Sequence, residues 1–153
     1  MANTYTQIHI QAVFAVKGRQ SLISPKWKDE LYKYITGIIQ SYDHKVLQIN
    51  GMPDHIHILF GMRPTQSISD LMKQVKQDSS KWINAKRLVR GKFAWQSGYG
   101  AFSYSKSHVR RVIQYIINQE KHHRSKTFVE EYVDLLKEAG VEYDDRYILK
   151  QVE

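Results

Sequence analysis

Two histidines separated by one residue are the strongest chemical signal in the sequence. They lie in the segment PDHIHILF as His55 and His57. Alternate side chains of an extended backbone point to the same face, so both imidazoles project from one side of a strand and Ile56 and Ile58 from the other. Two neutral imidazoles about 7 Å apart along a strand are suited to hold one divalent metal ion. The alternative is a strand with two half-exposed histidines.

A tyrosine and a glutamine one helical turn apart form a second candidate site. The segment 107–121, SHVRRVIQYIINQEK, has the periodicity of an amphipathic helix. Tyr115 and Gln119 fall off its apolar stripe, with Arg111 a turn before them. A tyrosine with a pKa near 10 is a poor nucleophile unless a metal polarises the phosphate that it attacks. Gln119 offers a neutral oxygen ligand, and the alternative for Tyr115 is a partly buried amphipathic side chain.

The composition limits the kinds of site that the chain can build. Its 153 residues are enough for one domain, with 1–105 as the core and 106–153 as a helical extension. The absence of cysteine excludes disulfides and thiolate metal sites, so a metal needs nitrogen and oxygen ligands, a set that suits Mg²⁺ or Mn²⁺. We find no signal peptide pattern and no apolar run of about 18 residues, which predicts a cytoplasmic protein without a membrane partner.

The charge of the chain favours a polyanionic partner. The formal net charge of the chain is +8. Residues 130–153 contain eight acidic and three basic residues and so carry −5, which means that residues 1–129 carry +13. Nucleic acid is the commonest partner of such a field, and a solvated basic helix face is the alternative. The residues predicted to contact DNA are Lys73, Lys76, Arg87, Arg90, Lys92, Arg111, Lys121, His122, His123 and Arg124.

The elements that must position these residues follow from periodicity and from turn signals. Strands are predicted within 6–16, 45–49, 55–60 and 93–105, and helices at 25–42, 67–85, 107–121 and 128–139. Asn50-Gly51 is interpreted as a turn signal in a connection that also contains Met52-Pro53-Asp54 and is therefore longer than a two-residue hairpin. Asp54 is interpreted as a turn residue that alternatively orients a histidine ring. The acids of the last helix are interpreted as keeping its face off DNA.

The order of these elements, β-α-β-β-α-β, is that of the ferredoxin-like fold, an α+β fold with one antiparallel sheet. In it the first and third strands are central neighbours and both helices cover one face, which leaves the other face free for His55 and His57. His9, in the first strand, is interpreted as a surface histidine that could approach this site if the two strands are neighbours.

Three motifs in this order resemble the single-tyrosine HUH transposases of small insertion sequences. They are PDHIHILF, then FAWQSGYGAFSYS at 93–105, then YIINQ followed by HH and a later RYI. The similarity runs from about Tyr5 to Tyr147. It implies that His55 and His57 are the HUH metal ligands, that Tyr115 is the nucleophile, and that Gln119 is the third ligand of a Mg²⁺ or Mn²⁺ ion.

The resemblance further implies a homodimeric DNA strand transferase that cuts and rejoins single-stranded DNA at the ends of a mobile element. The tyrosine would form a 5′-phosphotyrosine link, hairpins near the ends would be recognised, and the tyrosine helix of one subunit would complete the site of the other. Three alternatives remain open: a ferredoxin-like RNA-binding module, a metal-independent histidine nuclease, and a domesticated relative acting on chromosomal hairpin repeats.

Overall fold

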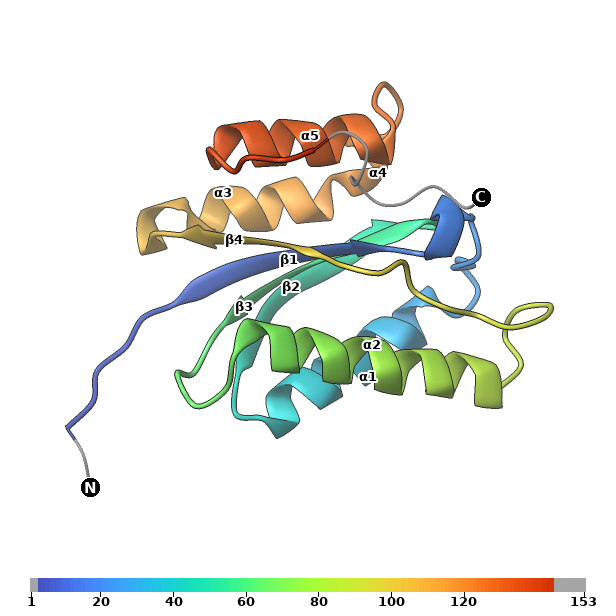
Figure 1. Ribbon diagram of the computed structural model, residues 1–153, viewed down its shortest axis with the longest axis horizontal. Coiled ribbons are helices and arrows are strands. Elements are labelled where there is room, and N and C mark those ends of the chain that lie inside the picture. Colours follow the sequence, from blue (N-terminus) through green and yellow to red (C-terminus); the bar gives the residue numbers. More distant parts are fainter. Residues whose placement is uncertain (1–2, 145–153) are drawn as a thin grey trace.

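The structure is a computed structural model, which describes residues 3–144, and it is built on one four-stranded antiparallel sheet with helices on both faces (Figure 1). The mixed α+β fold class is therefore confirmed. In chain order the elements are β1 (His9–Ala15), η1 (Lys17–Arg19), α1 (Lys28–Ser41), β2 (Lys45–Met52), β3 (His55–Gly61), α2 (Ile68–Ala85), β4 (Gly100–Tyr104), α3 (Lys106–Ile117), α4 (Gln119–His122) and α5 (Phe128–Glu138).

The strand order β2-β3-β1-β4 is the ferredoxin-like order, with β1 and β3 as central neighbours. Their antiparallel register sets Val13 opposite His57 and Ala15 opposite His55. His9 is paired with Gly61 at the other end of β3. The neighbouring strand therefore brings Gln11, and not His9, towards the histidine pair.

The main core lies between the sheet and the layer formed by α1 and α2. Alternate residues of β1 and β3, such as Phe14, Ile56 and Ile58, are fully buried there. The apolar residues of the helices meet them at intervals of three and four, including Leu31 and Ile35 of α1. This layer fixes the face of β3 that does not carry the histidines.

The opposite face of the sheet is covered by helices. The prediction that this face is free was therefore wrong. Helices α3 and α5 lie over it, on the side away from α1 and α2 (Figure 1). Leu59 of β3 packs against Val112 and Ile116 of α3, while Val13 and Ala15 of β1 pack against α5. Because β1 and β3 carry apolar residues on this face as well, the sheet needs a helical layer on both sides.

Several element boundaries differ from those predicted, and strand β4, predicted within 93–105, covers only Gly100–Tyr104. Helix α1 begins at Lys28, because Ser24 caps a turn by accepting a hydrogen bond from the Lys26 amide at 3.1 Å. Strand β2 continues through Gly51 to Met52, and the chain turns only at residues 53–54. Gly51 is therefore a strand residue. The predicted connection at 50–54 does contain the reversal, but its start at Asn50-Gly51 was wrong.

The tyrosine helix is interrupted at Asn118, where α3 ends and α4 begins. The Asn50 side chain of β2 donates to the carbonyls of Ile116 and Ile117, both at 3.1 Å, which ties the end of α3 to the sheet. Helix α5 starts with a capping box at Thr127 and ends before Gly140, whose φ of 68° is typical of a helix terminus. Within residues 3–144, no helix is long and apolar enough to cross a membrane.

Candidate active site

His55 and His57 project side by side from β3 into the space beneath α5, as the alternation of the strand predicts. Both side chains are fully buried, and their ring centroids lie 5.1 Å apart. The Nδ1 of His55 donates to the Asp54 carboxylate at 2.7 Å, and the Nδ1 of His57 lies 2.9 Å from the amide oxygen of Gln11. These contacts fix both rings, so that both Nε2 atoms point to one place.

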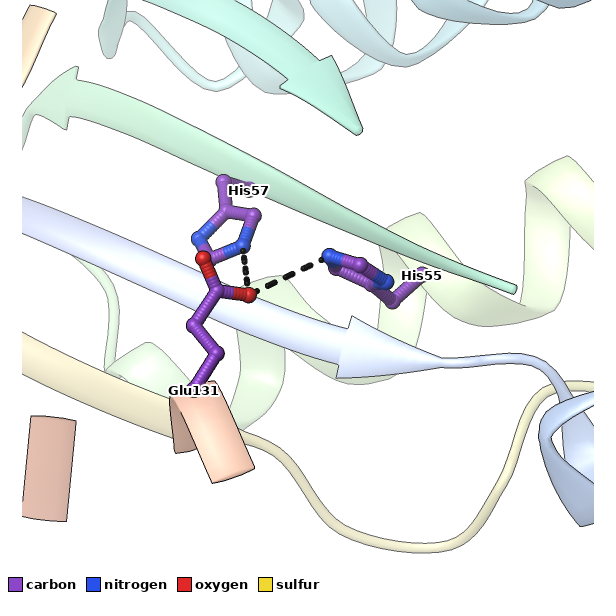
Figure 2. Close-up of side chains that lie close together, drawn as sticks. All are labelled: His55, His57 and Glu131. Atoms are coloured by element: carbon purple, nitrogen blue, oxygen red, sulfur yellow. Dashed lines mark hydrogen bonds and ion pairs between the residues drawn. The ribbon is translucent and has the colours of Figure 1, made fainter. Parts of the chain in front are cut away.

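That place is occupied by the carboxylate of Glu131, which enters from α5 (Figure 2). Its Oε1 lies 3.0 Å from Nε2 of His57 and 3.3 Å from Nε2 of His55. One ligand atom from each of the three residues lies within 4.8 Å of the others. Glu131 is buried in this cluster, a role that was not predicted for it.

The sequence does contain a signal for Glu131. At 100° per residue, Glu131 lies at the edge of the apolar stripe that Phe128, Tyr132 and Leu135 form on α5, and these three side chains are buried against the sheet. A charged residue beside an apolar stripe is rarely buried without a partner. Its position therefore indicated a buried polar contact, but not which residues would make it.

Tyr115 and Gln119 join the same cluster, so the structure brings together the four residues predicted as nucleophile and metal ligands. The Tyr115 hydroxyl donates to Oε2 of Glu131, and its ring lies edge-on to His57 with centroids 5.7 Å apart. The Gln119 side chain is fully buried, with Oε1 3.0 Å from Nε2 of His55 and Nε2 donating to Oε2 of Glu131 at 2.9 Å.

The residues predicted to contact DNA lie on two opposite sides of the sheet. One group is on α2 or follows it, on the helical layer away from the histidines; its exposed members are Lys73, Arg87, Arg90 and Lys92. In the same region the ammonium of Lys76 is half-buried and donates to the backbone carbonyls of Gln96 and Gly98 at 2.7 and 2.8 Å. Lys76 thus holds the segment before β4 in place.

The second group lies on the histidine side of the sheet. Arg111, Lys121 and Arg124 are exposed, while the ring of His122 lies 4.7 Å from that of Tyr115. His123 is part of the buried cluster, with Nε2 2.9 Å from Oε1 of Glu131. A cavity of about 580 Å³ opens beside Tyr115 and Glu131, and Lys121 and His122 help to line it.

The buried groups shift one another's ionisation. Burial disfavours a charged Glu131, but hydrogen bonds from His123, His55 and His57 outweigh it and hold the pKa of the carboxyl well below its usual range. Burial also disfavours the cation of His55, yet its bonds to Asp54 and Glu131 raise the pKa of His55 to about 9. For His57, burial prevails and lowers the pKa. One added proton therefore resides on His55, between two carboxylates.

Tyr115 remains a neutral phenol in this environment. Burial and the neighbouring negative charge of Glu131 raise the pKa of Tyr115 above its ordinary value. A change in the local charge is needed before this oxygen becomes a good nucleophile.

The donor atoms fit a divalent metal ion. Two imidazole nitrogens, the Glu131 carboxylate and the Gln119 amide oxygen converge, and the Nδ1 atom of each histidine is engaged by an acceptor outside the cluster. Such outer acceptors are the usual arrangement around histidines that bind metals, because they leave Nε2 free to coordinate. His55, His57, Glu131 and Gln119 are thus the residues that could hold the ion.

The raised pKa of His55 predicts how the stability of the metal-free protein depends on pH. The unfolded state has the ordinary pKa of 6.5 and the folded state about 9, so folding takes up a proton between these values. The stabilisation is complete below pH 6.5 and is lost as pH rises through 9. From pH 6.5 to 8 the free energy of unfolding should fall by about 1.5 kcal/mol, as measured by urea unfolding in EDTA.

The Asp54→Asn variant is the comparison for this measurement. It removes the carboxylate that bonds Nδ1 of His55 at 2.7 Å, so its stability should change less over the same interval. Burial lowers the pKa of Lys76 to about 8. Because titration of Lys76 makes the free energy of unfolding rise with pH above that value, the measurement stops at pH 8. Equal pH dependence in the two proteins would contradict the assignment to His55.

Comparison with known proteins agrees with this geometry. Residues 4–119 match the family model described as "Transposase IS200 like". The ISDra2 transposase TnpA of Deinococcus radiodurans is 25% identical over 118 residues, which cover 74% of this chain and 84% of that protein.

Two solved structures share the fold. A crystal structure from Deinococcus radiodurans R1, described as a candidate transposase, has a TM-score of 0.63 at 23% identity and covers 78% of this chain and 95% of that one. The structure of a REP-associated tyrosine transposase bound to a REP hairpin has a TM-score of 0.60 at 14% identity, covering 100% and 93%. The family match extends over most of the sequence, and the chain belongs to the IS200-like transposase family.

Proposed function

We propose that the chain cleaves and rejoins single-stranded DNA through a covalent bond to Tyr115, with the help of a divalent metal ion. One observation carries this proposal: the Tyr115 hydroxyl and the Nε2 atoms of His55 and His57 meet at the same buried carboxylate, Glu131. The nucleophile and the metal-binding nitrogens of the resemblance thus lie in one cluster. The match to the IS200-like transposases supports the same reaction.

In the proposed reaction the Tyr115 oxygen attacks a phosphodiester phosphorus. A bond from the tyrosine oxygen to phosphorus forms, and the bond from phosphorus to the 3′ oxygen breaks. The Tyr115 hydroxyl loses its proton and the 3′ oxygen takes one up, so the protons balance. The 5′ phosphate stays on the tyrosine and the 3′ oxygen leaves as a hydroxyl. The reverse attack by a 3′-OH reseals a strand, so the energy of the cleaved bond is kept and no nucleotide cofactor is consumed.

The residues of the cluster divide this work. His55, His57 and Gln119 would hold a Mg²⁺ or Mn²⁺ ion, with Glu131 as an added oxygen donor, and the bound ion would polarise the scissile phosphate. Glu131 orients the nucleophile, because its Oε2 accepts the hydrogen bond of the Tyr115 hydroxyl. The cavity beside Tyr115 is the proposed entry for the strand, with Lys121 positioned to contact its phosphates.

DNA recognition is proposed to use both basic groups. The residues near the cavity would contact the strand being cleaved, and the exposed bases on and after α2 would contact a hairpin on the far side of the sheet. Charge neutralisation of phosphates makes such binding steeply dependent on salt. The homodimer with shared sites remains a prediction from the resemblance; in the single chain, Tyr115 lies beside the histidines of its own subunit.

A second candidate is action on chromosomal hairpin repeats in place of the ends of a mobile element. The observation that favours it is coverage: the REP-associated transposase matches the whole chain in fold, including α5, whereas the other solved structure covers 78%. The two candidates share the reaction and differ in the DNA that is cleaved.

The test is a cleavage assay with labelled single-stranded DNA that carries a hairpin, taken either from the DNA flanking the gene or from chromosomal repeats. With Mg²⁺ or Mn²⁺ we expect a protein–DNA adduct that survives denaturation, and EDTA should abolish it. Duplex DNA of the same sequence should give no adduct. Cleavage without an adduct would instead favour a histidine nuclease and would overturn the proposal.

A further inference from the structure

His123 lies beside the group formed by His55, His57 and Glu131, although it belongs to neither of the two predicted constellations. It follows α4, its side chain is 7% exposed, and its ring lies 4.7 Å from that of His55. Its Nε2 is 2.9 Å from Oε1 of Glu131, the same oxygen that His55 and His57 approach. His123 and Glu131 both lie beyond residue 119, where the family match ends.

The hydrogen positions of the three rings follow from their outer partners. The Nδ1 of His55 faces the Asp54 carboxylate and the Nδ1 of His123 faces the Lys126 carbonyl at 2.7 Å. Both partners only accept, so each Nδ1 carries the hydrogen. The same holds for His57, since its partner is Oε1 of Gln11, an amide whose nitrogen donates to the Tyr104 hydroxyl.

A metal ion binds imidazole in its neutral form, and a neutral imidazole has one N–H, so in the metal-binding state each of these rings directs an unprotonated Nε2 at the cluster. Three nitrogen lone pairs then face Oε1 of Glu131 at 2.9–3.3 Å, and this oxygen is itself an acceptor. The amide oxygen of Gln119 adds another acceptor, 3.0 Å from Nε2 of His55. Buried acceptors without donors are costly, and a cation among them relieves this cost.

We propose that His123 is a third imidazole ligand of the metal site, which together with His55, His57 and the Glu131 carboxylate selects first-row transition-metal dications over Mg²⁺. Imidazole nitrogens bind such ions well, whereas Mg²⁺ prefers oxygen ligands and water. This inference rests on the proposed function only in that it takes the same residues to be a metal site. It adds a ligand from the segment after the family match and narrows the class of metal.

The test uses Co²⁺, whose visible absorption reports the number and kind of its ligands, with the full chain and no DNA. Wild type should bind Co²⁺ with ligand-field bands, and an excess of Mg²⁺ should not displace it. His123→Asn keeps a side-chain N–H that can reach the Lys126 carbonyl but removes Nε2. Its affinity for Co²⁺ should fall at least about 10-fold, with altered bands.

His108→Asn is the matched control, because His108 is an exposed histidine of α3 outside the cluster. It should bind Co²⁺ as wild type does, and circular dichroism should show that both variants are folded. The proposal is overturned if His123→Asn binds Co²⁺ with unchanged affinity and bands, if Mg²⁺ displaces Co²⁺ readily, or if wild type does not bind Co²⁺.

This measurement separates the inference from the proposed function, because it needs no DNA and no cleavage. A protein that binds Co²⁺ through His123 but forms no DNA adduct would support the metal site and overturn strand transfer. A protein that forms the adduct while His123→Asn binds Co²⁺ normally would support strand transfer and overturn the inference.

Discussion

Replacing Tyr115 by phenylalanine is expected to abolish the covalent DNA adduct and to lower strand cleavage by at least about 10⁴-fold, the order of loss seen when a nucleophile is removed. The ring remains beside His57, so only the attacking oxygen and its hydrogen bond to Glu131 are lost. Single-stranded DNA binding should change little. The readout is the labelled protein band on a denaturing gel, together with binding measured by fluorescence anisotropy.

Tyr34→Phe is the control for this variant. Tyr34 lies on α1, on the opposite face of the sheet, where it stacks on Trp82. Its loss should leave the adduct unchanged, which shows that removing a tyrosine hydroxyl as such has no effect. If Tyr115→Phe cleaved as well as wild type, the tyrosine would be structural and the histidine nuclease would become the better interpretation.

Gly51→Ala is expected to lower the free energy of unfolding by about 3 kcal/mol, the largest loss among the variants proposed for this protein. A Cβ at this position would lie 2.2 Å from the carbonyl oxygen of His55 and 2.8 Å from Cα of Ile56. Both are backbone atoms of β3, so the clash cannot be relieved by rotating a side chain. Relief requires β2 and β3 to separate where β3 carries the histidines, and urea unfolding with a metal titration would measure both consequences.

Gly37→Ala provides the opposite expectation in the same protein. Gly37 is exposed in the middle of α1, and a Cβ there would have no atom within 4 Å among the described residues. Alanine should stabilise the helix by about 0.5–1 kcal/mol. If the Gly51→Ala protein were as stable as wild type, β2 would not approach β3 at Gly51 as closely as described.

The sequence alone predicted which strands are neighbours in the sheet. It also predicted which functional residues lie on the same side of one strand or one helix. Alternation placed His55 and His57 on one face, and helical spacing placed Tyr115 and Gln119 off the apolar stripe, because both relations are local. The order of elements then gave β1 and β3 as neighbours. What the resemblance added was that the two pairs meet.

The contacts that the sequence did not predict depend on long-range packing. Glu131 joins the cluster only because α5 lies across β1 and β4, and nothing local in the helix says which face of the sheet it covers. The turn signal at Asn50-Gly51 was misinterpreted because glycine serves two purposes: here it permits close strand contact, and the reversal is left to residues 53–54. The contact of His123 with Glu131 was not predicted, because it depends on the path of the chain between α4 and α5.

The packing of α5 on the sheet limits how far the chain can be shortened. Phe128, Tyr132 and Leu135 cover Val13, Ala15 and Phe102, and the Tyr132 ring rests so close to Gly100 that a Cβ there would lie 2.6 Å from it. A version that stopped at residue 119 would retain the whole family match and still uncover this apolar surface. Such a protein should self-associate and precipitate, so the minimal soluble unit is longer than the family match.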